Sequence, residues 1–503
     1  MMTNTMKETG STGKARKPLL LLLVLTMFMS LLAACADGNG DTSTEKRVLR
    51  IGTLYGSPQD ESYFRQQYTD AFELMNSNIE IEIVSAINYN DQRFQTPDEN
   101  TKQPDSYEEL TKMLTGSNPV DVIVVEYSYL RRMVQDNLLK QLDPLIQQDK
   151  FDLSDYVPAV MEGIKSAGDN NIYALTPTFS SSALFYNKKL FTEANIDFPT
   201  DGMTWDEVFA KAGMLAKGEG KDRVYGLTFN RYGSDGFWDI QNYTGPLQLK
   251  IVDDKGEKML VNNPQWEKAW TDITELYKKK IMPTMEDIYQ ERDPEKPYNQ
   301  FEGDLFLSGR VAMVAMGDTN FINEITLMNE NAEKLGMEPI DWDIVTSPQH
   351  SEAAGVGGNV YLSSLMGINN KAQNDKDAWE FIKFMNSKEW AKLKSRSSYE
   401  LTARKEFLKP MNGLTYNVEA FTKLKPVPPQ SLEQEKLFRQ NSNMYQVQYI
   451  AQPYFQEVVK GDKTVKEALE KWETEGNAML QKIKANPNGP LEPTDGGVIQ
   501  EVY

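Results

Sequence analysis

An α/β fold with two lobes is predicted by three features of the sequence. Apolar, β-branched runs alternate with helical patterns in the first part of the chain, as in α/β proteins. The ~468 residues after the N-terminal leader exceed what one hydrophobic core usually supports, so two are expected. Two short apolar strands, about 172–175 and 183–186, are joined by a link that contains Pro177. Because proline cannot donate to a sheet ladder, this link is expected to connect two sheets.

The N-terminus carries the pattern of an exported bacterial protein. Four basic residues within the first 17 precede an apolar run at residues 19–34, which is short for a membrane span. The run ends in Leu32-Ala33-Ala34-Cys35, which resembles the lipobox of bacterial lipoproteins and contains the only cysteine of the chain. The resemblance implies cleavage before Cys35 and acyl chains such as palmitate on this residue. We expect residues 1–34 to be a signal peptide and 35–46 a lipidated tether; an uncleaved signal anchor is the alternative.

Charge and composition narrow the classes of function. The net charge is −19, and removal of residues 1–34, which carry +3, lowers it to −22. Such an acidic protein is not expected to bind nucleic acid. A histidine-based zinc site or catalytic triad would have to rest on His350, which we expect in a solvated loop. We therefore expect that the protein binds no metal or cofactor and that it is not an enzyme. A secreted glycosidase stays open, because paired carboxylates need no motif.

The first part of the chain alternates strands and helices. We expect a strand at 48–54, a helix at 61–76 with one apolar face, and a strand at 79–83 with one solvent-exposed face. Residues 120–125 are almost entirely apolar, as in a strand covered on both sides. Glu126 and Tyr127 are expected in the loop that follows.

The second part begins after the crossover. Thr204 and Glu207 form a capping box that opens a helix to about 217. A strand at 224–229 is followed by an aromatic, Gly-rich segment at 230–243, which is expected to be a loop and to expose Trp238. A helix from Asn263 carries tryptophans at core spacing. Further on we expect a strand at 361–368, a helix at 377–385, and a poorly ordered tail at 486–503.

Several segments, in order, resemble the extracellular solute-binding proteins of ABC importers, in the class that includes maltose-binding protein. The resemblance covers about residues 47–485. The segments are Pro119-x-Asp121-Val122, the crossover from Tyr173 to Phe191, Thr204-Trp205-Asp206-Glu207, Phe306 to Met313, Ala378 to Lys383, and Tyr399 to Arg404. The resemblance implies a type II periplasmic-binding-protein fold, with one lobe at 47–177 plus 361–400 and the other at 182–355 plus 403–485.

The resemblance also implies a function. Ligand is expected to bind between the lobes of a monomer held at the outer face of the cell membrane, and an ABC permease is the expected partner. An oligosaccharide is the expected solute; a peptide or another polar solute is the alternative. The family often stacks a sugar on an aromatic residue at the position of Gly317-Asp318-Thr319, which has none here. The candidate ligand contacts are Tyr55, Glu126, Tyr127, Phe179, Ser180, Ser181, Tyr232, Trp238, Asp239, Asp318, Asn359 and Tyr399.

Overall fold

The computed structural model of the chain describes residues 46–94, 104–229, 231, 236–288, 299–301, 303–357, 359–396 and 400–487. The expectations for Cys35, Tyr232, Tyr399 and the tail from 488 onward lie outside these residues. Within the described ranges, none of the helices combines the length and the apolar character needed to cross a bilayer.

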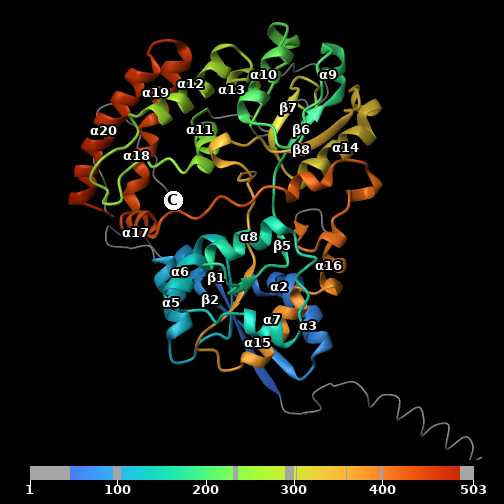
Figure 1. The fold of residues 1–503 in the computed structure, drawn as a ribbon, viewed down its shortest axis with the longest axis vertical. Helices are drawn as coiled ribbons and strands as arrows, with labels where there is room; N and C mark the ends of the chain where they lie inside the picture. The colour runs from blue at the N-terminus through green and yellow to red at the C-terminus, as the bar shows by residue number, and fades with distance from the viewer. Residues whose placement is uncertain are drawn as a thin grey trace, which may run out of the picture. The chain divides into compact units, whose positions relative to one another are not determined.

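Two β-sheets, joined by a two-stranded ladder, organise the chain (Figure 1). The strand orders are β2-β1-β3-β9-β4 in the larger sheet, β7-β6-β8 in the smaller sheet and β10-β5 in the ladder. β1 and β3 are parallel, and β9 runs antiparallel to β3 and β4. The strands are β1 (Arg47–Gly56), β2 (Ile79–Asn88), β3 (Val122–Val125), β4 (Ala174–Leu175), β5 (Thr178–Phe179), β6 (Ala183–Asn187), β7 (Met313–Gly317), β8 (Trp342–Thr346), β9 (Leu365–Ile368) and β10 (Leu401–Thr402).

The helices fall into two groups along the chain. Those that precede β6 or follow β9 directly are α2 (Glu61–Phe64), η1 (Arg65–Thr69), α3 (Asp70–Met75), α4 (Tyr89–Arg93), α5 (Ser106–Thr115), α6 (Tyr127–Gln135), α7 (Asp143–Gln148), α8 (Pro158–Ala167), α15 (Asp375–Met385) and α16 (Lys388–Lys394). The others are α9 (Lys188–Ala194), α10 (Trp205–Leu215), η2 (Gly220–Asp222), α11 (Gly236–Thr244), η3 (Gly245–Leu247), α12 (Pro264–Lys278), α13 (Met285–Ile288), α14 (Thr319–Leu335), η4 (Ser351–Ala353), η5 (Lys405–Phe407), η6 (Met411–Gly413), η7 (Val418–Thr422), α17 (Leu432–Gln440), η8 (Ser442–Tyr445), α18 (Gln446–Tyr449), α19 (Ala451–Lys460) and α20 (Val465–Ala485).

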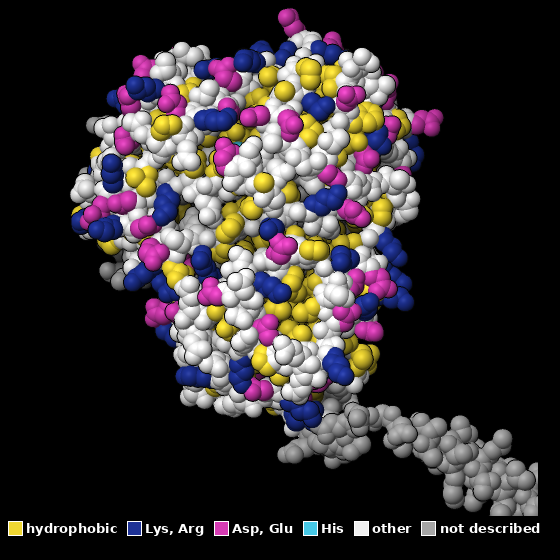
Figure 2. Space-filling model, in the orientation of Figure 1, with side chains coloured by type: hydrophobic (Ala, Val, Ile, Leu, Met, Phe, Trp, Pro, Cys, Tyr) yellow, Lys and Arg dark blue, Asp and Glu magenta, His cyan; other side chains and the backbone are white. Residues whose placement is uncertain are grey.

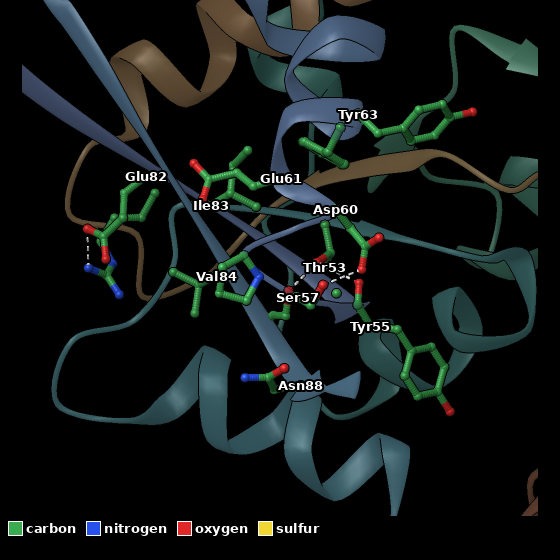
Figure 3. A pocket seen from close by; sticks show the side chains of 15 residues that line it. Thr53, Tyr55, Ser57, Asp60, Glu61, Tyr63, Glu82, Ile83, Val84 and Asn88 are labelled. Carbon is green, nitrogen blue, oxygen red and sulfur yellow. Dashed lines mark hydrogen bonds and ion pairs between the residues drawn. The ribbon is translucent and has the colours of Figure 1, made fainter. Parts of the chain in front are cut away.

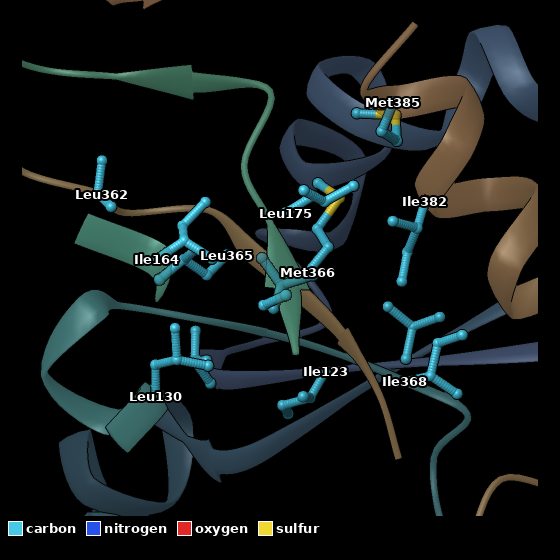
Figure 4. Close-up of a cluster of buried hydrophobic side chains, with 14 of the residues drawn as sticks. Ile123, Leu130, Ile164, Leu175, Leu362, Leu365, Met366, Ile368, Ile382 and Met385 are labelled. Carbon is cyan, nitrogen blue, oxygen red and sulfur yellow. The ribbon is translucent and has the colours of Figure 1, made fainter. Parts of the chain in front are cut away.

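The first core lies on the five-stranded sheet. All four residues of β3 are buried, as their unbroken apolar character predicts. Figure 4 shows side chains of β3, α6, β9 and α15 converging in this core, with Ile123, Leu130 and Ile382 fully buried. Phe72 of α3 meets Phe381 of α15 edge to face at 5.3 Å between ring centroids, which fixes these helices on each other.

The second core lies on both faces of the three-stranded sheet. Successive side chains of a strand point to opposite faces, so β6 contributes to two separate clusters. Leu184 and Tyr186 pack with α10, α11 and α12 on one side, whereas Ala183 and Phe185 pack with α14 on the other. The capping box of α10 forms as predicted: the Thr204 hydroxyl accepts from the Glu207 N–H, and the Glu207 carboxylate accepts from the Thr204 N–H.

The predicted link between two sheets is confirmed. β4 pairs in the five-stranded sheet, β6 pairs in the three-stranded sheet, and Pro177 lies between them. Within the link, β5 pairs antiparallel with β10, and Ser180 forms an isolated bridge with Tyr361. The first crossing from one sheet to the other therefore lies beside the chain that returns at Tyr361.

A third connection runs through the segment after β10. The Arg404 guanidinium donates to the Asn386 and Asp152 carbonyl oxygens, so this residue is still fixed to the first core. Tyr416 then stacks on Trp342 of β8 at 5.4 Å between ring centroids. The chain thus passes from the first core to the second between residues 404 and 416.

Some local predictions were wrong. Glu126 and Tyr127 do not form a loop; Glu126 is the N-cap of α6 and Tyr127 is its first residue. Trp238 lies in α11 rather than in a loop. The expected strand at 224–229 is reduced to isolated bridges at its two ends.

The prediction of a solvated loop histidine was also wrong. His350 is 6 % exposed, and its Nε2–H donates to the Tyr243 carbonyl oxygen at 2.6 Å. Burial lowers the pKa of His350 below its usual value, although this hydrogen bond favours the charged form. The imidazole also meets the Tyr243 ring edge to face at 4.5 Å, so it is part of the second core.

Candidate functional site

Exposed tyrosines gather at one edge of the five-stranded sheet. Tyr55 lies near the end of β1, Glu126 directly follows β3, and Tyr361 precedes β9. These positions come together because β1 and β3 are parallel and β9 is antiparallel, with Val125 opposite Leu365. The side chains of Tyr55 and Tyr361 are 42 % and 43 % exposed, which is unusual for such large apolar rings.

Hydrogen bonds and ring stacking join these side chains into one surface. Tyr55 stacks on Tyr89 with ring centroids 5.4 Å apart and planes 9° apart. The Tyr55 hydroxyl lies 2.9 Å from the Ser106 hydroxyl, and Ser106 also hydrogen-bonds to the Tyr129 hydroxyl. The tyrosine cluster, as we call it, comprises Tyr55, Tyr89, Ser106, Glu126, Tyr129 and Tyr361.

The surroundings of Tyr129 and Tyr361 keep their phenols protonated. Burial raises the pKa of Tyr361, and its hydrogen bond to the Glu126 carboxylate raises it further. Burial likewise raises the pKa of Tyr129, against the opposing effect of Ser106. The cluster therefore offers exposed ring faces, hydroxyl groups and one carboxylate, and none of its six members is a lysine or an arginine.

A cavity of about 450 Å³ borders the tyrosine cluster at Tyr55 (Figure 3). In the close-up, Tyr55 of β1 and Tyr63 of α2 extend from it on the same side. Inside, the Ser57 hydroxyl donates to Asp60 at 2.6 Å, and Arg50 pairs with Glu82 at 2.6 Å. The positive charge of Arg50 is thus neutralised within the cavity wall.

A second exposed aromatic surface lies on α11. Trp238 is 45 % exposed and meets Tyr449 of α18 at 6.3 Å between ring centroids. Two residues close to Trp238 in the sequence, Gly236 and Asp239, fix the helix against its neighbours. A side chain at Gly236 would begin 2.1 Å from the Phe455 ring, and buried Asp239 accepts a hydrogen bond from the Tyr277 hydroxyl at 2.5 Å. Trp238 is left on the outer face of the helix.

The structure places the other candidate contacts differently. Phe179, Ser181, Tyr127 and Asp239 are buried, so they serve packing rather than an open surface. The Tyr127 hydroxyl, for example, donates to the Gly163 carbonyl oxygen.

Three candidates keep some exposure without joining either surface. The Ser180 N–H donates to the Tyr361 carbonyl oxygen, and Asp318 caps α14 by accepting from the Phe321 N–H. Asn359 is exposed and has a φ of 43°. The missing aromatic at 317–319 is not replaced by Phe321, which is 1 % exposed.

Several residues of the two surfaces were missed by the sequence analysis. These are Tyr89, Ser106, Tyr129, Tyr361 and Tyr449. Tyr361 could have been found, because it begins a predicted strand on the side where the chain returns to the first sheet. The others carry no local signal, since only the pairing of distant elements brings them together.

Comparisons with known sequences identify relatives. The chain is 23 % identical over 393 residues to the sn-glycerol-3-phosphate-binding periplasmic protein of Escherichia coli K12, covering 74 % of this chain and 81 % of that protein. The homologous protein of Salmonella typhimurium is 24 % identical over 398 residues, with the same coverage.

Solved structures show the same fold. A sugar transporter from Rhizobium etli in an open conformation aligns with a TM-score of 0.57 and 18 % identity, covering 86 % of this chain and 99 % of the other. The sugar-binding protein MalE from Xanthomonas citri aligns with a TM-score of 0.56 and 16 % identity, covering 87 % and 98 %. The predicted two-lobe, type II periplasmic-binding-protein fold is confirmed. The model of the bacterial extracellular solute-binding proteins matches residues 55–392, and the chain belongs to this family.

Proposed function

We propose that the chain is the solute-binding component of an ABC importer and that its solute is an uncharged oligosaccharide. The observation that carries the proposal is the tyrosine cluster, in which the Glu126 carboxylate accepts a hydrogen bond from the Tyr361 hydroxyl. Aromatic faces bury the apolar sides of sugar rings, while carboxylates and hydroxyls satisfy the ring hydroxyls, which are costly to leave unpaired. Trp238 and Tyr449 supply a second aromatic surface of the same kind.

Charge favours a neutral solute over the phosphate ester bound by the sequence relatives. A phosphate placed on the tyrosine cluster would face the Glu126 carboxylate, and like charges at short range repel. Two arginines beside members of the cluster have acidic partners: Arg132, three residues after Tyr129, pairs with Glu435 at 3.2 Å, and Arg439 pairs with Asp105, the residue before Ser106. On the face shown in Figure 2, acidic and basic side chains are mixed, with no large basic area to attract an anion.

The two cores would act as lobes that close on the solute. We propose lobes at 47–177 plus 361–400 and 182–355 plus 403–485, with the last boundary moved to between 404 and 416 by the contacts of Arg404. A solute shifts the open and closed populations only by its differential affinity for the two states. A permease that recognises the closed form would then distinguish the loaded protein from the empty one.

Membrane attachment belongs to the same proposal. A lipid on Cys35 would hold the protein at the outer face of the cell membrane, next to its permease. Replacement Cys35→Ser should abolish the lipid mass shift and release the protein from the membrane fraction. Wild-type membrane recovery with an unchanged mass shift would contradict the anchor.

A thermal-shift screen of the mature protein tests the proposed function. Neutral oligosaccharides and sn-glycerol-3-phosphate are compared, and a solute at 100 times its Kd should add about 2.7 kcal/mol of stability. We expect stabilisation by an oligosaccharide that is recovered intact after long incubation. Stabilisation by the phosphate ester alone would contradict the neutral solute, and steady release of shorter sugars would indicate a glycosidase.

A further inference from the structure

A second pocket, of about 360 Å³, lies between η3, α17 and the end of α11. Its polar wall is rich in glutamine side chains, and its apolar wall includes Ile251 and Trp266. We call it the glutamine pocket; its glutamines are Gln241, Gln248, Gln430, Gln434 and Gln448. All of its lining residues lie within 241–266 and 427–448, so it is formed without the five-stranded sheet.

The glutamine pocket continues the surface of Trp238 along α11. Trp238 and Gln241 are three positions apart, so they lie on the same face of the helix, one turn after the other. Their partners on α18 are also adjacent: Trp238 contacts Tyr449, and the Gln241 side chain lies 3.5 Å from that of Gln448. An aromatic pair is thus followed by an amide pair, which opens into the pocket.

The amides have hydrogen-bonding capacity to spare. A primary amide has two donors and an oxygen that accepts twice. Gln248 uses one donor on the Pro428 carbonyl oxygen at 2.7 Å, and the contact between Gln241 and Gln448 is at the upper limit for a hydrogen bond. Gln434 differs, because its amide is held by Val252 and Asp254.

The glutamine pocket is close to electrically neutral. Among the described residues that line it, Lys250 is the only charged one, and its ammonium group pairs with Asp254 at 2.7 Å. A ligand with many hydroxyls fits such a lining, since each hydroxyl both donates and accepts, as each amide does. The volume is within the range of small-molecule pockets.

We propose that the glutamine pocket is a second carbohydrate subsite, which binds the residues of an oligosaccharide beyond the sugar that stacks on Trp238. The inference rests on the proposed function for the class of ligand. It adds that affinity depends on chain length, because only a solute long enough to pass Gln241 and Gln448 reaches the pocket.

A length series measures this dependence. An array of neutral oligosaccharides first identifies a sugar that the wild type binds, and titration calorimetry then follows that sugar from one residue to six. The variants are Gln241→Leu and Gln448→Leu, with Gln241→Glu as an isosteric variant should the leucines disturb packing. Gln148→Leu on α7, an exposed glutamine of the first lobe, is the matched control.

We expect wild-type affinity to rise with length and the pocket variants to lose about tenfold for the longest sugar. Their affinity for the single sugar should change less than about twofold, the scale of a surface substitution, and the control should bind every length as the wild type does. Unchanged binding of all lengths by the pocket variants would overturn the subsite. An equal loss at every length would also overturn it, because the glutamines would then belong to the primary site. A wild type that binds no sugar on the array would refute the proposed function itself.

Discussion

Helices α11 and α12 pack against each other and carry tryptophan in opposite environments. Trp270 of α12 is fully buried, with the rings of Phe455 and Trp472 each 5.8 Å away between centroids. Trp238 of α11 is 45 % exposed, although its helix is docked through the hydrogen bond between Asp239 and Tyr277. Packing accounts for Trp270, whereas Trp238 contacts the rings of Phe237 and Tyr449 and keeps nearly half of its surface exposed. Burial thus separates a core residue from a candidate for solute binding.

The largest expected effect is on the buried side of this comparison. Trp270→Ala should lower the free energy of unfolding by about 3–5 kcal/mol, because it removes a large side chain and leaves a cavity among packed rings. A denaturant titration measures the loss. A change within about 0.5 kcal/mol, as at an ordinary surface site, would show that burial does not distinguish the two tryptophans.

Substitution of the exposed tryptophan, Trp238, should change solute affinity rather than stability. Trp238→Ala is expected to weaken solute affinity by roughly 2–4 kcal/mol, the range of a hot-spot residue, and to change stability little. Calorimetry with the identified sugar, beside a thermal melt of the free variant, separates the two quantities. Intact affinity with a large loss of stability would assign Trp238 to packing instead.

A smaller effect is expected at the tyrosine cluster. Glu126→Gln should weaken sugar binding by roughly 1.5–3 kcal/mol, the contribution of a hydrogen bond to a charged group. It should also lower the pKa of Tyr361, because the carboxylate that helps to raise it is gone. Ultraviolet titration of the phenols measures this shift. Unchanged affinity together with a lowered pKa would leave Glu126 a partner of Tyr361 only, without a role towards the solute.

The smallest effect is expected at His350. Because the folded protein lowers the pKa of His350, the unfolded chain binds a proton first as the pH falls below about 6.5. Stability should therefore decrease from pH 7 to pH 5, and His350→Gln should flatten this part of the profile. Denaturant titrations at several pH values measure the slope. As His350 is the only histidine of the chain, an identical slope in the variant would contradict the assignment.

Periodicity and capping predicted much of the fold, whereas the candidate surfaces depend on which side chains the fold leaves exposed. The apolar run of β3 and the capping box at Thr204 are local patterns, so they could be recognised without tertiary information. The helix around Trp238 could not, because Gly233 and Gly236 are typical of a loop and only the close Phe455 ring explains a glycine at the helix start. Asp239 was predicted to contact ligand because its side chain is polar, but it is buried and bonded to Tyr277. That partner is 38 positions away, so the sequence gives no sign of it.

A crystal structure of the protein with its sugar bound tests the central claim most directly. The account predicts that one solute contacts both lobes, with a sugar ring on Trp238 and a ring hydroxyl hydrogen-bonded to Glu126 of the tyrosine cluster. A solute held elsewhere, with both Trp238 and the tyrosine cluster in contact only with water, would contradict it.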